Sequence, residues 1–158
     1  MSDTTPSPAT SPATSKDRLR LWLRVLKATR AVESEIRENL RRDFATTLPR
    51  FDVMAALTQH GDGLKMSELS GVLKVSNGNV TGIVDRLVED GHAAREKVPG
   101  DRRASRVILT AKGRAEFAHQ AAAHEAWIDQ IFAHVGPLDA VNIAETLDGV
   151  AKQLEDRD

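Results

Sequence analysis

Short polar side chains gather at the expected start of a helix near the middle of the chain, at Ser76, Asn77, Asn79 and Thr81. Such groups donate and accept hydrogen bonds at close range, and asparagine can pair bidentately with the edge of adenine in a major groove. The absence of a side chain at Gly78 lets the helix start approach a phosphate, toward which its free N–H groups point. Arg86 follows two turns later and adds a cation. The competing interpretation is an ordinary helix cap with a solvated polar face.

A second group of candidate residues is basic and comprises Lys97, Arg102, Arg103 and Arg106. Arg102 and Arg103 follow Pro99-Gly100-Asp101, a sequence typical of a tight turn. Cations at such a tip can enter a minor groove, which attracts them where A·T-rich tracts narrow it. We expect Lys97 and Arg106 to contact phosphates, and Asp101 to orient Arg103 or to cap the turn. A basic solvated turn is the alternative.

The helix that carries the first group is expected to be the second of a close pair. Ser67 is placed to cap a short helix over residues 68–73, and Ser76 to cap a second helix that runs to about Asp90. Gly91 supplies the left-handed residue that ends it. The buried face of this helix repeats at helical spacing through Val80, Ile83, Val84 and Leu87. Two short helices joined by a brief turn are typical of a helix-turn-helix.

The basic group is expected on a hairpin, because the apolar period switches to two after the second helix. Residues 93–98 alternate, the turn follows, and residues 106–109 return as a second strand. A helix-turn-helix followed directly by a basic hairpin is a winged helix. The expected fold is therefore mostly α with a small β-hairpin wing, and the winged helix-turn-helix domain spans residues 49–110.

Helices flank this domain on both sides, over residues 16–48 and 111–158. Thr110 is placed to cap the first helix of the second segment, which runs to Val135, and Gly136-Pro137 separates it from the last helix. A small winged helix cannot cover the apolar faces of all these helices, so a second copy of the chain is needed as a partner. The two segments are thus expected to form a helical dimerisation region.

Composition limits what else the chain can do. Its 158 residues include no cysteine, and the five histidines do not fall at the spacing of two metal ligands on one helix face. Neither a Gly-rich phosphate loop nor a Ser/His/Asp arrangement is present, so we expect no enzyme, no metal and no cofactor. Residues 1–15, rich in Pro, Ser, Thr and Ala, are expected to form a disordered tail rather than a secretion signal. No apolar stretch approaches the ~18 residues of a membrane span, which predicts a cytoplasmic protein without a membrane partner.

The net charge of −1 conceals an uneven distribution. Residues 16–30 hold six basic residues and one acidic residue, and residues 95–106 hold five basic and two acidic residues. Residues 137–158 hold two basic and six acidic residues. The two basic segments, and not the overall sum, determine whether a phosphate backbone is attracted.

Two stretches carry a family resemblance: residues 66–96, with the expected helix-turn-helix, and residues 100–113, GDRRASRVILTAKG. The second combines in a fixed order Asp101, Arg103, Leu109, Thr110 and Gly113. With these motifs the chain resembles the MarR family of transcription regulators over about residues 17–156. Asn77-Gly78-Asn79 stands where many members carry Ser or Thr, a departure that concerns the operator sequence and not the binding mode.

The resemblance implies a homodimer whose two winged-helix lobes bind a pseudo-palindromic site on double-stranded DNA. It also implies that a small ligand, often aromatic, binds between the lobes and the dimerisation region and changes the DNA affinity. The expected function is thus a ligand-responsive regulator that represses a catabolic operon. The alternative is a winged-helix module for protein interaction, or a DNA architectural protein without a ligand. The salt dependence and sequence preference of DNA binding separate these possibilities.

Residues 18–27 and 47–57 further resemble members that respond to CoA thioesters of aromatic acids. The ligand-binding candidates are accordingly Arg18, Arg20, Trp22, Arg24 and Arg50. The basic stripe formed by Arg20, Arg24 and Lys27 could neutralise an anionic ligand or pair with the acidic last helix. Trp22 and Trp127 could line an aromatic pocket or lie in the core or the dimer interface.

Overall fold

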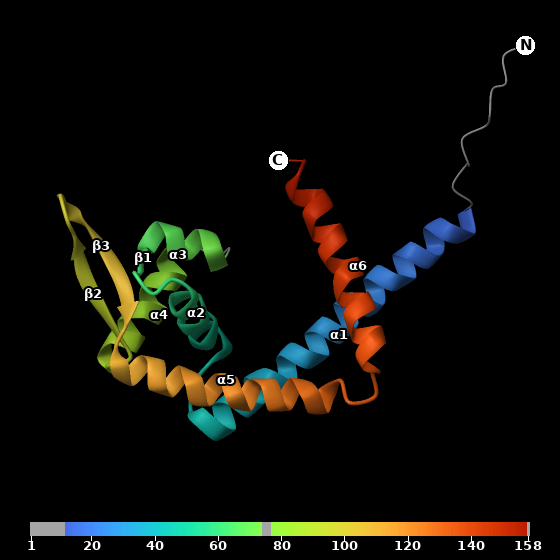
Figure 1. The fold of residues 1–158 in the computed structure, drawn as a ribbon, viewed down its shortest axis with the longest axis horizontal. Coiled ribbons are helices and arrows are strands. Elements are labelled where there is room, and N and C mark those ends of the chain that lie inside the picture. The colour runs from blue at the N-terminus through green and yellow to red at the C-terminus, as the bar shows by residue number, and fades with distance from the viewer. Residues whose placement is uncertain (1–11, 74–76, 158) are drawn as a thin grey trace, which may run out of the picture. The chain divides into compact units, whose positions relative to one another are not determined.

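The computed structural model describes residues 12–73 and 77–157 (Figure 1). The chain divides after Leu48 into two compact units. In the first unit, helix α1 spans Pro12–Phe44. It begins four residues before the expected start at Lys16, because a proline fits the first turn of a helix and none of the residues after it breaks one. Residues 12–15 are therefore helical, which corrects the expectation of disorder for that part of the tail. Residues 1–11 lie outside the described residues.

Helix α1 differs in character between its two ends. Toward the N-terminus, four large apolar residues are each more than half exposed, namely Leu19, Leu21, Trp22 and Leu23. In the last turn, the hydrogen bond from Arg41 lowers the pKa of the Glu38 carboxyl, and that from Arg42 lowers the pKa of the Asp43 carboxyl. The basic residues of the C-terminal end are thus already paired, whereas the N-terminal half presents an apolar surface.

The second unit holds the remaining elements. They are α2 (Leu48–Gln59), β1 (Leu64–Lys65), α3 (Met66–Leu73), α4 (Asn77–Glu89), β2 (Ala93–Val98), β3 (Asp101–Leu109), α5 (Ala111–Ile131) and α6 (Pro137–Glu155). The expected fold class, mostly helical with a small hairpin wing, is confirmed. Ser67 lies inside α3 and does not cap it, because the Glu68 carboxylate instead accepts a hydrogen bond from the Lys65 N–H at 2.7 Å. Helix α5 ends four residues before the expected Val135.

The sheet has three antiparallel strands in the order β1-β3-β2. Strand β1 is not predicted from the sequence, because two residues are too few to show an alternating pattern. In the structure, Leu64 of β1 pairs with Val107 of β3. Strand β3 begins at Asp101, five residues before the expected start, and the register shifts between Lys97 and Val98 near the tip. Figure 1 shows the β2–β3 hairpin reaching beyond α3 and α4.

A single apolar core joins the helix-turn-helix to the sheet. Its fully buried side chains come from four elements and include Val53 and Leu57 of α2, Leu69 of α3, Val84 of α4 and Val107 of β3. On α4 the expected apolar face is buried: Val80, Val84 and Leu87 lie in the core, and Ile83 packs against it. Because this face of α4 is held inward, the polar residues of its first turns face outward.

Several hydrogen bonds tie the end of α4 to the start of α5. Gly91 takes the expected left-handed backbone, with φ 76°, and its carbonyl accepts a hydrogen bond from the Thr110 hydroxyl at 2.6 Å. The same hydroxyl accepts the N–H of Gly113 at 3.0 Å, which is the expected cap of α5. The Lys112 ammonium donates to the Asp90 carbonyl at 2.8 Å. The orientation of α4 is therefore fixed from α5 as well as from the core.

Helix α6 is amphipathic, yet none of its residues is buried. Its large apolar residues remain exposed, namely Leu138, Val141, Ile143, Leu147, Val150 and Leu154. Within residues 12–73 and 77–157, no helix is long and apolar enough to cross a membrane.

Candidate nucleic-acid interface

The start of α4 presents polar groups to the outside. Asn79 and Thr81 are exposed in the first two turns, and open space surrounds Gly78. Asn77 is the first residue of α4, but its side chain, like the whole of Ser76, lies outside the described part of the structure. The described residues thus form an unobstructed helix start of the kind that can meet a groove or a phosphate.

Arg86 lies further along α4 and has partners on its own helix. Its guanidinium forms ion pairs with Glu89 at 3.6 Å and with Asp90 at 3.5 Å. The side chain is 54% exposed, and these distances are long for charge-assisted hydrogen bonds. A phosphate could compete for this guanidinium, so its contact with DNA stays a prediction.

The wing carries its cations at the outer end of the hairpin. Arg102 and Arg103 are exposed on the first residues of β3, and neither guanidinium forms an ion pair or a hydrogen bond with any described residue. The Asp101 carboxylate accepts the backbone N–H of Arg103 at 3.0 Å, which is the geometry of a turn cap. Gly100 supplies the left-handed residue of the turn, with φ 81°. Lys97 is exposed nearby on β2, opposite Ser105.

Arg106 sits lower on the hairpin and braces it. One guanidinium nitrogen donates to the Asp62 carbonyl at 3.1 Å, and the aliphatic stem covers Gly63, where a Cβ atom would lie 2.6 Å from it. Arg106 therefore attaches β3 to the loop before β1. The other N–H groups of the guanidinium can still contact a phosphate, and this expected contact stays a prediction.

An ion pair between Asp85 of α4 and Arg95 of β2 is not predicted by the sequence motifs. It crosses from the helix to the hairpin, over ten residues of sequence. One signal was available: Arg95 shares the alternation of Ala93, which is buried against the core, and so its side chain points to the helical side of the strand.

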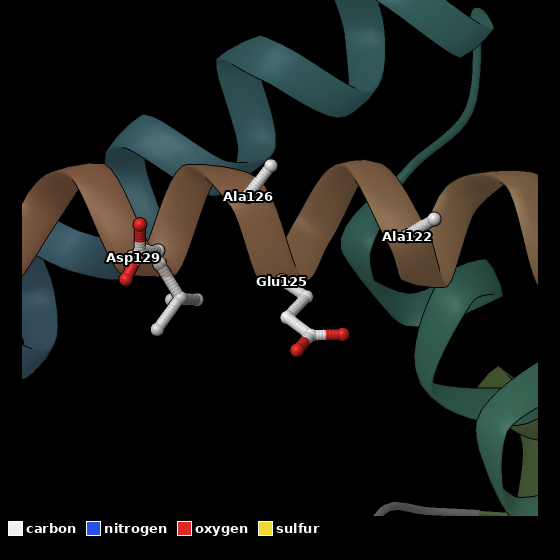
Figure 2. A pocket seen from close by; sticks show the side chains of 5 residues that line it. Ala122, Glu125, Ala126 and Asp129 are labelled. Atoms are coloured by element: carbon white, nitrogen blue, oxygen red, sulfur yellow. The ribbon is translucent and has the colours of Figure 1, made fainter.

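The candidate ligand residues lie on elements of both units. Arg20 pairs with Asp17 at 2.8 Å, and Arg18, Trp22 and Arg24 are exposed on α1, whereas Arg50 is half-buried on α2. A shallow hollow of about 470 Å³ on α5 is lined by Ala122, Glu125, Ala126, Ile128 and Asp129. Figure 2 shows these side chains on α5, with the Glu125 carboxylate extending away from the helix. Its two carboxylates make this hollow unfavourable for an anion.

A second hollow, of about 560 Å³, lies between α5 and α6 and is mainly apolar. Its lining includes Phe132 and Val135 from the end of α5, and Ile143 and Leu147 from α6. Arg50, the candidate ligand residue in the same unit, does not line it. Among the described residues, no group of three or more His, Asp or Glu side chains could hold a metal ion.

The second helix of the helix-turn-helix is exposed, and a cationic hairpin with a register shift and a turn cap follows it. These features define a DNA-binding protein of the winged helix-turn-helix class. The MarR family model matches residues 46–105. The crystal structure of a MarR family transcriptional regulator from Silicibacter pomeroyi is 32% identical, with a TM-score of 0.76, over 91% of this chain and 99% of that one. The chain belongs to the MarR family of transcription regulators.

Two further proteins are similar. The uncharacterized HTH-type transcriptional regulator YkoM of Bacillus subtilis (strain 168) is 28% identical over 87% of this chain and 77% of its own length. Sco3205, a MarR family transcriptional regulator from Streptomyces coelicolor solved in complex with DNA, is 24% identical, with a TM-score of 0.77, over 87% of this chain and 91% of that one. The family and these relatives are regulators of transcription, and so this chain is a regulator and not an enzyme.

Proposed function

We propose that the chain acts as a homodimer that binds a pseudo-palindromic operator in double-stranded DNA and represses a catabolic operon until a small aromatic ligand releases it. The observation that carries the proposal is the pair of exposed wing guanidiniums, Arg102 and Arg103, without a described partner. Exposed arginines at the tip of a hairpin are available for charge-assisted hydrogen bonds, and the phosphate backbone of DNA supplies suitable acceptors.

In the proposed complex, α4 enters the major groove and the hairpin reaches the adjacent minor groove. The polar residues Asn79 and Thr81 then face base edges or phosphates, and Arg102 and Arg103 follow the minor groove. Lys97 is the nearest further cation on β2. Two such lobes fit half-sites about one helical turn apart, which is why the operator should be pseudo-palindromic.

Dimerisation through the terminal helices is supported by their surface. Helix α6 exposes its whole apolar face, and α1 exposes leucines and Trp22 near its N-terminal end. Exposed apolar patches of this kind mark contact sites, and a second copy presents the same patches for a self-complementary interface.

The wing is tested by replacing Arg103 with alanine. We expect the affinity for an operator, isolated by selection from random duplexes, to fall about tenfold, and the salt slope of binding to fall by about 1 if Arg103 contacts a phosphate. Arg37→Ala is the matched control, since it removes an exposed arginine of α1, paired with Glu33 at 3.3 Å, and changes the net charge equally. Fluorescence anisotropy at several salt concentrations measures both quantities. If the Arg103→Ala protein binds the operator as tightly as the unchanged protein, the wing is not part of the DNA interface.

The ligand is tested by adding free aromatic acids and their CoA thioesters to the protein–operator complex. The support for an anionic ligand is the set of α1 cations Arg18, Arg24 and Lys27, which form no ion pair with a described residue. We expect at least one of these compounds to weaken operator binding tenfold or more, which needs about 1.4 kcal/mol of coupling. Arg24→Gln should reduce this response without changing the affinity of the ligand-free protein for the operator, and Arg37→Gln should change neither.

A reporter gene placed behind the operator shows whether the protein represses or activates transcription.

A further inference from the structure

The ion pair between Asp85 and Arg95 connects the proposed recognition helix with the wing. Asp85 lies in the middle of α4, and Arg95 lies on β2, two residues beyond the buried Ala93. Other ion pairs, such as Arg41–Glu38 and Arg86–Asp90, join neighbours within about one helical turn. The Asp85–Arg95 pair joins two different elements and can therefore fix the position of one against the other.

The hairpin needs such a fixed position because only its base is packed. Ala93, Val107 and Leu109 are buried near the base, whereas the residues from Arg95 to Arg103 are exposed or half-buried. Arg106 braces β3 through the Asp62 carbonyl, and Arg95 braces β2 through Asp85. The two braces act on the two strands of the hairpin, and only the second reaches α4.

We propose that Asp85 and Arg95 are positioning residues for DNA recognition: their ion pair sets the wing at the distance from α4 at which both can enter neighbouring grooves. This inference rests on the proposed DNA-binding function. The pair acts through the wing arginines, and neither Asp85 nor Arg95 has to touch DNA. Its loss lets the hairpin move relative to the helix, so that Arg103 no longer reaches its groove whenever α4 is engaged.

For the removal of the Asp85 carboxylate, charge repulsion and a positioning role predict opposite changes in DNA affinity. This carboxylate is 59% exposed on a helix proposed to lie against phosphates, so removing the negative charge should strengthen binding if the residue were a bystander. A positioning role predicts weaker binding instead. Exposed ion pairs contribute little to folding, and variants of this pair should therefore remain folded and measurable.

The experiment combines Asp85→Asn and Arg95→Gln with Arg103→Ala and measures operator affinity for each single and double variant. We expect Asp85→Asn and Arg95→Gln each to weaken binding by about three- to fivefold, which is as much as an exposed ion pair can contribute. We expect the loss caused by Arg103→Ala to shrink to less than about threefold in either background, because the wing is then already displaced. Arg95→Lys keeps the charge and should retain most of the affinity.

Glu89→Gln is the matched control on the same helix. It also removes an exposed carboxylate from α4, one that is paired with Arg86 and not with the wing. We expect it to leave binding unchanged or to strengthen it. The proposal is overturned if Asp85→Asn binds as tightly as the unchanged protein, or if Arg103→Ala costs the same in every background. A protein that binds no duplex at all, even unmodified, refutes the proposed function itself, so the two failures are distinguishable.

Discussion

Replacing Val150 with glutamate is expected to convert the protein from a dimer to a monomer at micromolar concentration. Val150 is 53% exposed in the single chain, so the folded chain itself tolerates a charge there. In the proposed dimer, each copy would bury this carboxylate in the apolar face of α6 without a partner. A buried unpaired charge costs several kcal/mol, and we expect the dimer dissociation constant to rise by at least about 100-fold. Sedimentation equilibrium measures this change.

The matched control is Gln153→Glu, which adds the same charge to the polar face of α6 and should leave the dimer intact. The operator affinity of Val150→Glu should also fall by about 10²-fold or more, because two linked lobes bind far more tightly than one. If Val150→Glu remains dimeric, α6 does not supply the interface. The proposed arrangement of half-sites then loses its geometric basis.

The elements that position the interface could be predicted because local rules determine them. The period of Val80, Val84 and Leu87 fixes which face of α4 is buried, and Gly91 ends the helix because the left-handed backbone favours glycine. The Thr110 cap follows from the chemistry of its hydroxyl at a helix start. Each feature depends on residues within a few positions, which a single sequence displays.

The contacts that orient these elements could not be predicted, because they join residues distant in sequence. Strand β1 forms because Leu64 pairs with Val107 of β3. Arg106 donates to the carbonyl of Asp62, which is 44 residues earlier in the sequence. For the Asp85–Arg95 pair, the alternation along β2 indicates only which side Arg95 faces, and its partner depends on the angle between a helix and a strand. The sequence pattern therefore predicts which polar and basic groups meet DNA, whereas the contacts that orient these groups are visible only in the fold.

Gly113 shows the same distinction most sharply. Its place in the first turn of α5 suggests only that glycine is tolerated there. In the structure it is buried, and an added Cβ would overlap the carbonyl oxygen of His92 and lie 2.7 Å from the carbonyl carbon. That carbonyl cannot easily retreat, because it accepts the backbone N–H of Thr110 at 3.0 Å. Glycine is therefore required where the chain leaving α4 crosses the start of α5.

Replacing Gly113 with alanine is accordingly expected to lower the free energy of unfolding by about 3 kcal/mol or more, at the upper end of what overpacking costs. Urea denaturation followed by circular dichroism, at one fixed protein concentration, measures the change. Gly82→Ala is the control: its Cβ meets nothing within 4 Å on the exposed side of α4, and it should be neutral or stabilise by up to about 1 kcal/mol. Operator binding should decline with Gly113→Ala, since the Thr110 and Lys112 hydrogen bonds that hold the end of α4 depend on the same crossing. An unchanged urea midpoint would mean that the backbone at His92 yields readily, and that the junction does not hold α4 in place.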